Sequence, residues 1–404
     1  MSRTTDRAGI SRRAFLSRTL RGLALIAMAG PTGWLPREGS ASTDLPSGGP
    51  PLITRVERPF DAETPVPAFT SYLTPNHLFF VRSHFGPPLA EAVAESTWKL
   101  RVGGLVERPI EFTLSQLRRM ESVSLTAVVQ CSGNGRAFQR PNVPGVQWER
   151  GAVGNAQWIG VRLRDVLAKA GVKAQAHHVQ LRGADRPVVS QTPLFVRSIP
   201  IEKALHPDTL LATHMNGEPL PLLHGAPLRL ITPGWMADSC VKWLTDLTVQ
   251  TEEAKGYYME TAYRYPQQPV SPGESVPASA MKPVEEMVVK SLIVSPTQEA
   301  VLKPGLVMVR GVAWTGEGRI ARVEVSTDEG ATWRQARLTG TDRPYAWRQW
   351  ECEWTPDRPQ TVTILSRATD DRGNMQPVTS PWNPGGFLWN GMDRVNVRVE
   401  GDTP

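Results

Sequence analysis

The segment Gln130–Arg136 combines, within seven residues, a cysteine, a glycine-rich turn and an arginine. It follows an apolar run at residues 125–129, which predicts a buried strand. A thiolate at the end of a strand is a good soft ligand for a metal, and an arginine five positions on can hold an anion beside it. Taken alone, the pattern fits a buried structural cysteine before a tight turn equally well. The interpretation therefore depends on the rest of the chain.

A mixed α/β region at residues 72–265 must position this segment. Residues 113–120 predict a short capped helix. Residues 161–170 predict another, because their apolar side chains recur at helical spacing and Gly171 follows as a stop. Residues 42–71 are rich in proline, glycine and serine, and we interpret them as an extended lead-in.

The pattern changes after residues 266–284, a proline-rich stretch that we interpret as a linker. Beyond it, residues 307–314, 321–326 and 361–365 alternate in the manner of short strands. Strands of this kind over residues 285–404 predict an immunoglobulin-like β-sandwich, so the expected fold class is α+β. Such a domain more often mediates packing or dimerisation than chemistry.

The N-terminal residues 1–41 predict a targeting segment rather than part of the fold. Residues 11–16, Ser-Arg-Arg-Ala-Phe-Leu, form a twin-arginine signal, and the apolar stretch at residues 20–30 is too short to remain as a membrane span. We expect cleavage near Ala41 and a periplasmic mature protein, exported already folded. An uncleaved basic tail is the alternative interpretation.

Charge and cysteine content exclude several classes of protein. Residues 1–41 carry seven arginines against two acidic residues, and the remainder has 38 basic and 37 acidic side chains, a net charge of +1. The mature chain therefore offers no basic surplus for binding nucleic acid. Its three cysteines, Cys131, Cys240 and Cys352, include no Cys-x-x-Cys pair, which excludes a disulfide framework and the usual zinc ribbon.

Further motifs accompany the cysteine segment in a fixed order. Residues 79–84 read Phe-Phe-Val-Arg-Ser-His, residues 131–136 read Cys-Ser-Gly-Asn-Gly-Arg, and shorter motifs follow at 158–167, 198–200, 215–221, 224–229 and 241–244. The set resembles the sulfite oxidase family of molybdenum enzymes, close to its bacterial periplasmic sulfite dehydrogenases. In that family the first two segments read aromatic-x-Arg-Asn-His and Cys-Ala-Gly-Asn-Arg-Arg.

The resemblance implies a molybdenum centre with one protein ligand, the thiolate of Cys131. The other sulfurs would come from molybdopterin, a pyranopterin dithiolene. Soft sulfur donors suit a metal that cycles between high oxidation states. The resemblance also implies contacts to this cofactor from five side chains: His84, Asp185, His224, Arg229 and Lys242.

For the substrate, the resemblance implies an anion site made by Arg82, Arg136 and Arg394, with Tyr263 as the active-site tyrosine. Arginine suits this task because its planar fork pairs two oxygens of an oxyanion and stays charged. Arg394 would bring the C-terminal domain into the pocket, and an exposed salt bridge is its alternative role. The hydroxyl of Tyr263 would bond to the substrate or to an oxygen on the metal.

Two positions depart from the family pattern. Ser83 replaces an asparagine, and Gly135 replaces the first of two consecutive arginines. Both departures leave the expected metal and cofactor ligands in place. They could change contacts to the pterin or the positive field at the mouth of the pocket.

The reaction that the resemblance implies is oxygen transfer to sulfite, or to a related small sulfur oxyanion, followed by the departure of two electrons. Because we expect no haem domain ahead of the molybdenum domain, an external acceptor such as a c-type cytochrome would take the electrons. The family also implies a homodimer formed through the C-terminal domain.

Three alternatives remain open at this point. A sulfoxide reductase of the same superfamily would share the cysteine and pterin site but normally lacks the C-terminal domain. A sulfane dehydrogenase would have both domains, although the arginine and tyrosine pattern fits free sulfite better. A non-catalytic binding or dimerisation module is the third, and Cys131, Arg82, Arg136 and Tyr263 argue against it.

Overall fold

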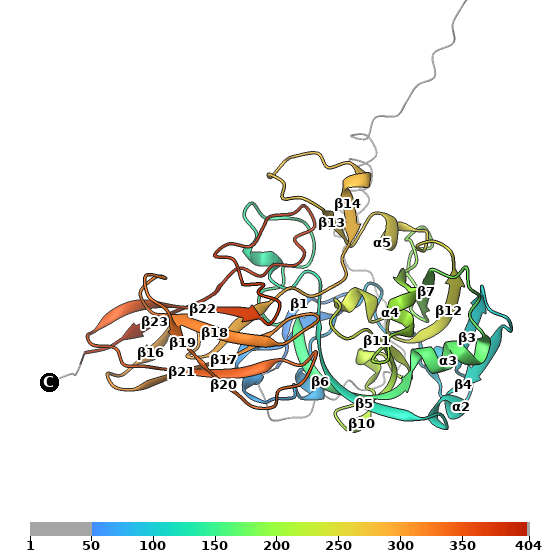
Figure 1. Cartoon of the computed structure of the whole chain (residues 1–404), viewed down its shortest axis with the longest axis horizontal. Coiled ribbons are helices and arrows are strands. Elements are labelled where there is room, and N and C mark those ends of the chain that lie inside the picture. Colours follow the sequence, from blue (N-terminus) through green and yellow to red (C-terminus); the bar gives the residue numbers. More distant parts are fainter. Residues whose placement is uncertain (1–50, 402–404) are drawn as a thin grey trace, which may run out of the picture. The chain divides into compact units, whose positions relative to one another are not determined.

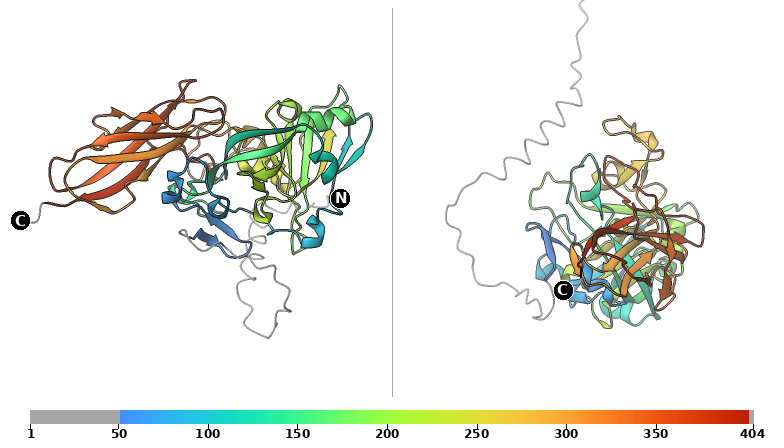
Figure 2. Two further views of the ribbon diagram at one scale, coloured as in Figure 1. Left: turned by 90° about the horizontal axis from the view of Figure 1, so that it is seen from below. Right: turned by 90° about the vertical axis from the view of Figure 1, so that its left-hand side faces the viewer.

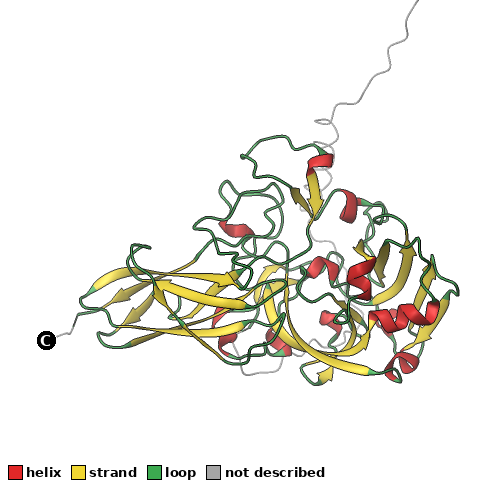
Figure 3. Ribbon diagram, viewed as in Figure 1, coloured by secondary structure: helices red, strands yellow, loops and turns green. Residues whose placement is uncertain are grey.

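The computed structural model describes residues 51–401, so the predicted export signal lies outside the described residues. Within them, strands predominate and the helices are short; every helix precedes the strands of the C-terminal domain (Figure 3). No helix in this part of the chain is both long and apolar enough to cross a membrane.

The first sheet of the N-terminal domain carries the cysteine segment (Figure 1). Its order is β10 (Glu218–Pro219), β9 (Leu210–Met215), β6 (Val153–Arg162) and β5 (Ser122–Gln130), with β11 (Arg229–Ile231) also paired to β9. Strand β5 pairs antiparallel with β6 along its whole length, and its last four residues are buried. The predicted buried strand is confirmed, and it ends one residue before Cys131.

The second sheet has the order β4 (Ile110–Thr113), β3 (Lys99–Gly104), β12 (Leu244–Gln250), β7 (His178–Gly183) and β8 (Val196–Pro200). Only β3 and β12 run parallel. Around these strands lie the helices α2 (Leu114–Arg118), α3 (Leu163–Ala170) and α4 (Ile201–Leu205). The apolar faces of α2, α3 and α4 and of the sheet share one buried core.

Both predicted helices are present. Helix α2 begins with a capping box, in which Thr113 Oγ1 accepts from Gln116 N at 3.2 Å and Gln116 Oε1 accepts from Thr113 N at 2.8 Å. Helix α3 ends at Gly171, with φ 73°. It begins two residues later than predicted because Arg162 still pairs with Leu210 in the first sheet.

The predicted β-sandwich is confirmed, and its two sheets lie face to face (Figure 2). One has the order β15 (Lys290–Ser295), β17 (Val307–Trp314), β21 (Arg348–Trp354) and β20 (Arg337–Thr339). The other has β16 (Ala300–Leu302), β23 (Asp393–Val399), β22 (Gln360–Asp370), β18 (Ile320–Ser326) and β19 (Arg334–Gln335). Inward-facing residues of both sheets form one hydrophobic core, which includes Cys352.

The segments expected to be a lead-in and a linker both contain regular structure. In the first, β1 (Ile53–Val56) pairs with β2 (Asp61–Glu63), all of whose residues are buried. In the second, β13 (Arg264–Pro266) pairs with β14 (Met281–Pro283). Five short 3-10 turns of the N-terminal domain lie at 66–70, 76–78, 136–138, 222–224 and 237–239. Two more lie at 90–93 and 278–280, and α5 spans Tyr257–Glu260.

The C-terminal domain braces the strand that leads to Cys131. Trp314 Nε1 donates to Gln130 Oε1 at 2.6 Å, and Val128 N donates to Tyr345 O at 2.8 Å. On the other side of the cysteine, Leu388 N donates to Ser132 O at 3.0 Å. The backbone on both sides of Cys131 is therefore held by residues more than 180 positions away along the chain.

The burial of Lys290 leads us to expect that the stability of the protein rises with pH. Lys290 is 1% exposed and its ammonium lacks a hydrogen-bond partner among the described residues; burial lowers its pKa from 10.5 to about 7, against the pull of Asp393. Between these two values the unfolded chain binds one more proton than the folded chain. The free energy of unfolding should therefore rise with pH in that window, by up to about 1.4 kcal/mol per unit.

Urea unfolding at several pH values in that window, compared between wild type and Lys290→Met, measures this slope. As pH rises through that window, the unfolding free energy of wild type should increase relative to that of Lys290→Met. Parallel curves would show that Lys290 does not titrate in this way.

Candidate active site

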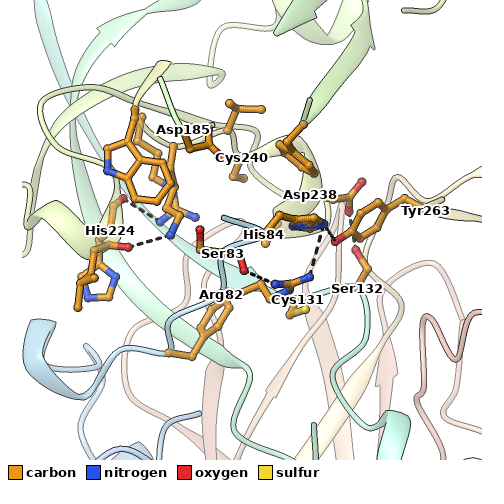
Figure 4. A pocket seen from close by; sticks show the side chains of 18 residues that line it. Arg82, Ser83, His84, Cys131, Ser132, Asp185, His224, Asp238, Cys240 and Tyr263 are labelled. Carbon is orange, nitrogen blue, oxygen red and sulfur yellow. Dashed lines mark hydrogen bonds between the residues drawn. The ribbon is translucent and has the colours of Figure 1, made fainter. Parts of the chain in front are cut away.

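One open cavity gathers most of the predicted functional residues (Figure 4). Arg82, His84, Cys131, Asp185, His224, Arg229, Lys242 and Tyr263 all line it, together with Phe80, Ser83, Ser132, Phe195, Leu223, Ala237, Asp238, Cys240, Val241 and Trp243. These side chains come from segments spread over more than 180 positions, which the two sheets and their loops bring together.

Cys131 lies where β5 ends and the chain turns. Asn134 N donates to Cys131 O at 2.9 Å, and Cys131 N donates to Ala152 O at 2.9 Å. The residue is 6% exposed, and burial raises the pKa of its thiol, while Arg82 and Arg136 act in the opposite direction. The loop thus presents one sulfur to the cavity on a backbone fixed by hydrogen bonds.

The structure explains the glycine at position 135. Gly135 has φ 96°, a left-handed conformation that L residues rarely adopt. A Cβ atom at this position would lie 2.6 Å from Cε3 of Trp389. The indole of Trp389 therefore fills the space that an arginine side chain would need.

Arg82 presents a guanidinium to the cavity beside Cys131 (Figure 4). Its Nη1 donates to Asp61 Oδ2 at 3.0 Å and to the carbonyl oxygen of Ser83. Its Nη2 lies 3.5 Å from His84 Nε2. Burial disfavours the charge of Arg82, but neighbouring acidic groups, Tyr263 and Asp61 first, outweigh burial and raise its pKa.

Tyr263 and His84 form a hydrogen-bonded pair at the end of the cavity that holds Cys131 and Arg82. The Tyr263 hydroxyl lies 3.1 Å from His84 Nε2. Burial, and then the charge of Arg82, lowers the pKa of His84 to about 2, so its imidazole is neutral. Tyr263 adopts φ 54°, a conformation that costs a bulky residue about 1–3 kcal/mol. Its ring stacks on Phe387 at 5.5 Å and beneath the guanidinium of Arg197 at 5.4 Å, and these contacts hold the strained backbone in place.

The opposite end of the cavity holds cations and donors. Lys242 Nζ donates to Leu223 O at 2.9 Å, and burial followed by the charge of Arg229 lowers its pKa to about 7. Burial also lowers the pKa of His224 to about 3. The neutral ring therefore uses Nε2 to donate to Asn76 O at 2.9 Å. Burial raises the pKa of Asp185 to about 6.

Two of the three predicted anion-binding arginines lie elsewhere. Arg136 is buried beside the cavity, where Nε donates to Gly385 O and Nη1 to Val146 O, each at 3.0 Å. Arg394 is exposed on β23 and lines a separate surface depression with Trp389. Its predicted place in the pocket is corrected: Asp393 and Val395 on the same strand face inward, and strand residues alternate.

Sequence reasoning missed a buried ion pair at the cavity wall. Arg197 Nη2 lies 2.7 Å from Asp238 Oδ2, and both side chains are 1% exposed. Ser132 Oγ donates to Asp238 Oδ1 at 2.5 Å, and Arg197 Nη1 donates to Tyr258 O at 2.5 Å. The pair thus connects the Cys131 loop to the segment that carries Tyr263. Its only sequence signal is an acid within the otherwise uncharged residues 230–241.

Breaking this pair should destabilise the protein strongly. Arg197→Met leaves the Asp238 carboxylate buried without its cation and should cost about 3–5 kcal/mol of unfolding free energy. Ser132→Ala removes only one hydrogen bond and should cost about 1–3 kcal/mol. Chemical unfolding measures both.

The matched control is Arg118→Met, which breaks the exposed pair of Arg118 with Glu95. It should cost less than about 1 kcal/mol. Equal losses for Arg197→Met and Arg118→Met would contradict the structural role of the buried pair.

Comparison with known proteins agrees with this geometry. The oxidoreductase molybdopterin binding domain matches residues 84–258, and the Mo-co oxidoreductase dimerisation domain matches residues 281–400. Human mitochondrial sulfite oxidase is 36% identical over 373 residues, which cover 88% of this chain and 67% of the human protein. The chain belongs to the sulfite oxidase family.

Two further proteins are similar to this chain over most of its length. Sulfite oxidase of Arabidopsis thaliana is 33% identical over 390 residues, which cover 90% of this chain and 98% of the plant protein. Among solved structures, the sulfane dehydrogenase SoxCD of Paracoccus pantotrophus matches with a TM-score of 0.74 and 28% identity, covering 93% of this chain and 98% of that chain. The protein is thus a molybdenum oxidoreductase that uses a molybdenum–molybdopterin cofactor.

The cavity fits this cofactor. Cys131 supplies one soft sulfur at one end, as a molybdenum ligand requires. At the other end Arg229 is 5% exposed and its Nε has no hydrogen-bond partner among the described residues. A buried donor of this kind calls for a polar ligand. Arg229, Lys242 and His224 would hold the polar edges and phosphate of the pterin.

Proposed function

We propose that this protein oxidises sulfite to sulfate in the periplasm and passes the electrons to an external acceptor such as a c-type cytochrome. The observation that carries the proposal is the convergence of Cys131, Arg82 and Tyr263 on one cavity whose far end is cationic. The twin-arginine motif at residues 11–16 supports export of the folded protein. The sulfite oxidases among its relatives support the substrate.

The bound cofactor supplies the oxygen-atom transfer and accepts the two electrons. The chain's own residues prepare the substrate. Arg82 binds the anion beside Cys131, and Tyr263 directs a hydroxyl, held by neutral His84, toward the same place. Phe80 and Phe195 line the wall and exclude water, which strengthens these polar contacts.

We also propose a homodimer formed through the β-sandwich, supported by the match of residues 281–400 to a dimerisation domain. A second candidate activity is sulfane oxidation, which the likeness to SoxCD favours. Sulfoxide reduction is the weaker alternative, since a reductase normally lacks the dimerisation domain present here. A non-catalytic module would bind no molybdenum.

The test is to express the full chain in a host that makes molybdopterin and to measure molybdenum content and sulfite-dependent reduction of cytochrome c or ferricyanide. Near-stoichiometric molybdenum with sulfite turnover supports the proposal. Loaded molybdenum without sulfite turnover favours the sulfane or sulfoxide activity. Absence of molybdenum from well-folded protein contradicts the enzyme assignment.

The proposed export by the twin-arginine route can be tested separately from the activity. Replacing Arg12 and Arg13 together by lysine should leave the protein in the cytoplasm, because the paired arginines are the recognised element of the signal. Cell fractionation followed by immunoblotting measures the distribution. Unchanged periplasmic protein in this variant would contradict the twin-arginine route.

A further inference from the structure

Asp61 is a buried carboxylate that touches the anion-binding arginine but not the cavity itself. It lies on β2, with a side chain that is 2% exposed. Its Oδ1 accepts from Ser83 N at 2.9 Å, and its Oδ2 accepts from Arg82 Nη1 at 3.0 Å. The carboxylate therefore fixes both the backbone and the guanidinium of the segment that faces Cys131.

The contact with Asp61 occupies one of the two terminal nitrogens of the Arg82 guanidinium. Nη1 is used by Asp61 and by the Ser83 carbonyl, whereas Nη2 approaches His84 and Nε has no hydrogen bond among residues 51–401. An anion in the cavity can therefore meet only the remaining edge of the fork. It also feels the negative charge of Asp61 directly behind the positive charge of Arg82.

The other arginines near Cys131 do not present a free guanidinium edge to an anion in the cavity. Arg136 gives its donors to two carbonyl oxygens and is absent from the cavity lining. Arg197 is paired with Asp238. Arg394 lies on the outer face of β23. Of these four arginines, only Arg82 therefore offers donors to an anion in the cavity, and its charge is the one that Asp61 opposes directly.

We propose that Asp61 acts through Arg82 as a specificity-determining residue, which lowers the affinity of the cavity for dianions relative to monoanions. The proposal rests on the anion-binding role of Arg82 in the proposed function. Coulomb energy scales with the charge of the ligand, so removing the charge of Asp61 must favour a dianion twice as strongly, on a logarithmic scale, as a monoanion.

The test is calorimetric binding of two non-reacting anions to the molybdenum-loaded enzyme: sulfate, a dianion, and methanesulfonate, a monoanion with a similar sulfonyl head. Asp61→Asn keeps the shape of the side chain and its acceptor for Ser83 N. It should tighten sulfate binding by about tenfold and methanesulfonate binding by about threefold. Equal factors for the two anions, or no tightening, would overturn the proposal.

Glu63→Gln is the matched control, because Glu63 is also a buried carboxylate on β2 but pairs with Arg55 rather than with Arg82. It should leave the ratio of the two affinities unchanged, and a ratio that shifts as in Asp61→Asn would count against the proposal. If Asp61→Asn does not fold, Asp61→Ser takes its place, because it removes the same charge and can still accept from Ser83 N. The same two-to-one ratio on a logarithmic scale is expected, and equal factors overturn the proposal.

Failure of the inference is distinguishable from failure of the proposed function. Binding of these anions is measured without turnover, so an enzyme that does not oxidise sulfite can still show the predicted two-to-one logarithmic effect. An enzyme that oxidises sulfite but shows equal factors would retain the proposed function and exclude the role of Asp61.

Discussion

Cys131→Ser should lose sulfite turnover by at least about 10³-fold, a transition-state effect of about 4 kcal/mol, while keeping most of its molybdenum. The loss follows because a serine oxygen is a harder donor than a thiolate and does not stabilise the metal in the same way. The metal should remain because Arg229, Lys242 and His224, which line the opposite end of the cavity, would still hold the pterin.

The measurements are molybdenum content by elemental analysis, the visible absorption of the thiolate–metal bond, and sulfite turnover. Cys352→Ser is the control, because Cys352 is a buried cysteine in the core of the β-sandwich and does not line the cavity. It should keep the absorption band and the turnover. A Cys131→Ser protein that retains a tenth or more of the wild-type rate would refute the role of Cys131 as the essential ligand.

The sequence allowed much of the scaffold to be predicted, because its elements follow from local periodicity. The alternating pattern of residues 307–314 corresponds to β17, and the apolar run at 125–129 lies within β5. The position of Cys131 at a strand end followed from the same pattern. Local patterns succeed here because the side chains that define each element are neighbours along the chain.

Charge pairing around the cavity could not be predicted in this way. Asp61 pairs with Arg82 across 21 positions, and Asp238, the partner of Arg197, also accepts a hydrogen bond from Ser132 across 106, so no local window contains these contacts. Asp61 also lies in a segment whose proline-rich composition suggested an extended lead-in. Burial of a carboxylate is decided by its partner, and the partner is known only once the fold is known.

Arg394 is a different case, because its placement could have been predicted. The residues Asp393, Val395, Val397 and Val399 alternate with polar ones, so a strand here must turn Arg394 outward if the valines face the core. The family resemblance suggested a pocket residue at this position, whereas strand periodicity predicts an exposed one. The structure follows the periodicity.

Arg82→Gln is the second large effect: it should reduce kcat/KM for sulfite by at least about 10²-fold, because the cavity loses the guanidinium that we propose binds the anion beside Cys131. The same change leaves Asp61 buried without its cation. The protein should therefore also lose about 3–5 kcal/mol of unfolding free energy. Activity and stability would fall together, and the single variant alone does not separate the two causes.

The double variant Arg82→Gln with Asp61→Asn separates them. Neutralising both partners removes the uncompensated buried charge, so most of the lost unfolding free energy should return. Sulfite turnover should not return, because no guanidinium faces the anion. Steady-state kinetics and urea unfolding on the four proteins of this cycle measure both quantities. Recovery of turnover in the double variant would show that Arg82 serves only to neutralise Asp61, and that the anion is bound elsewhere in the cavity.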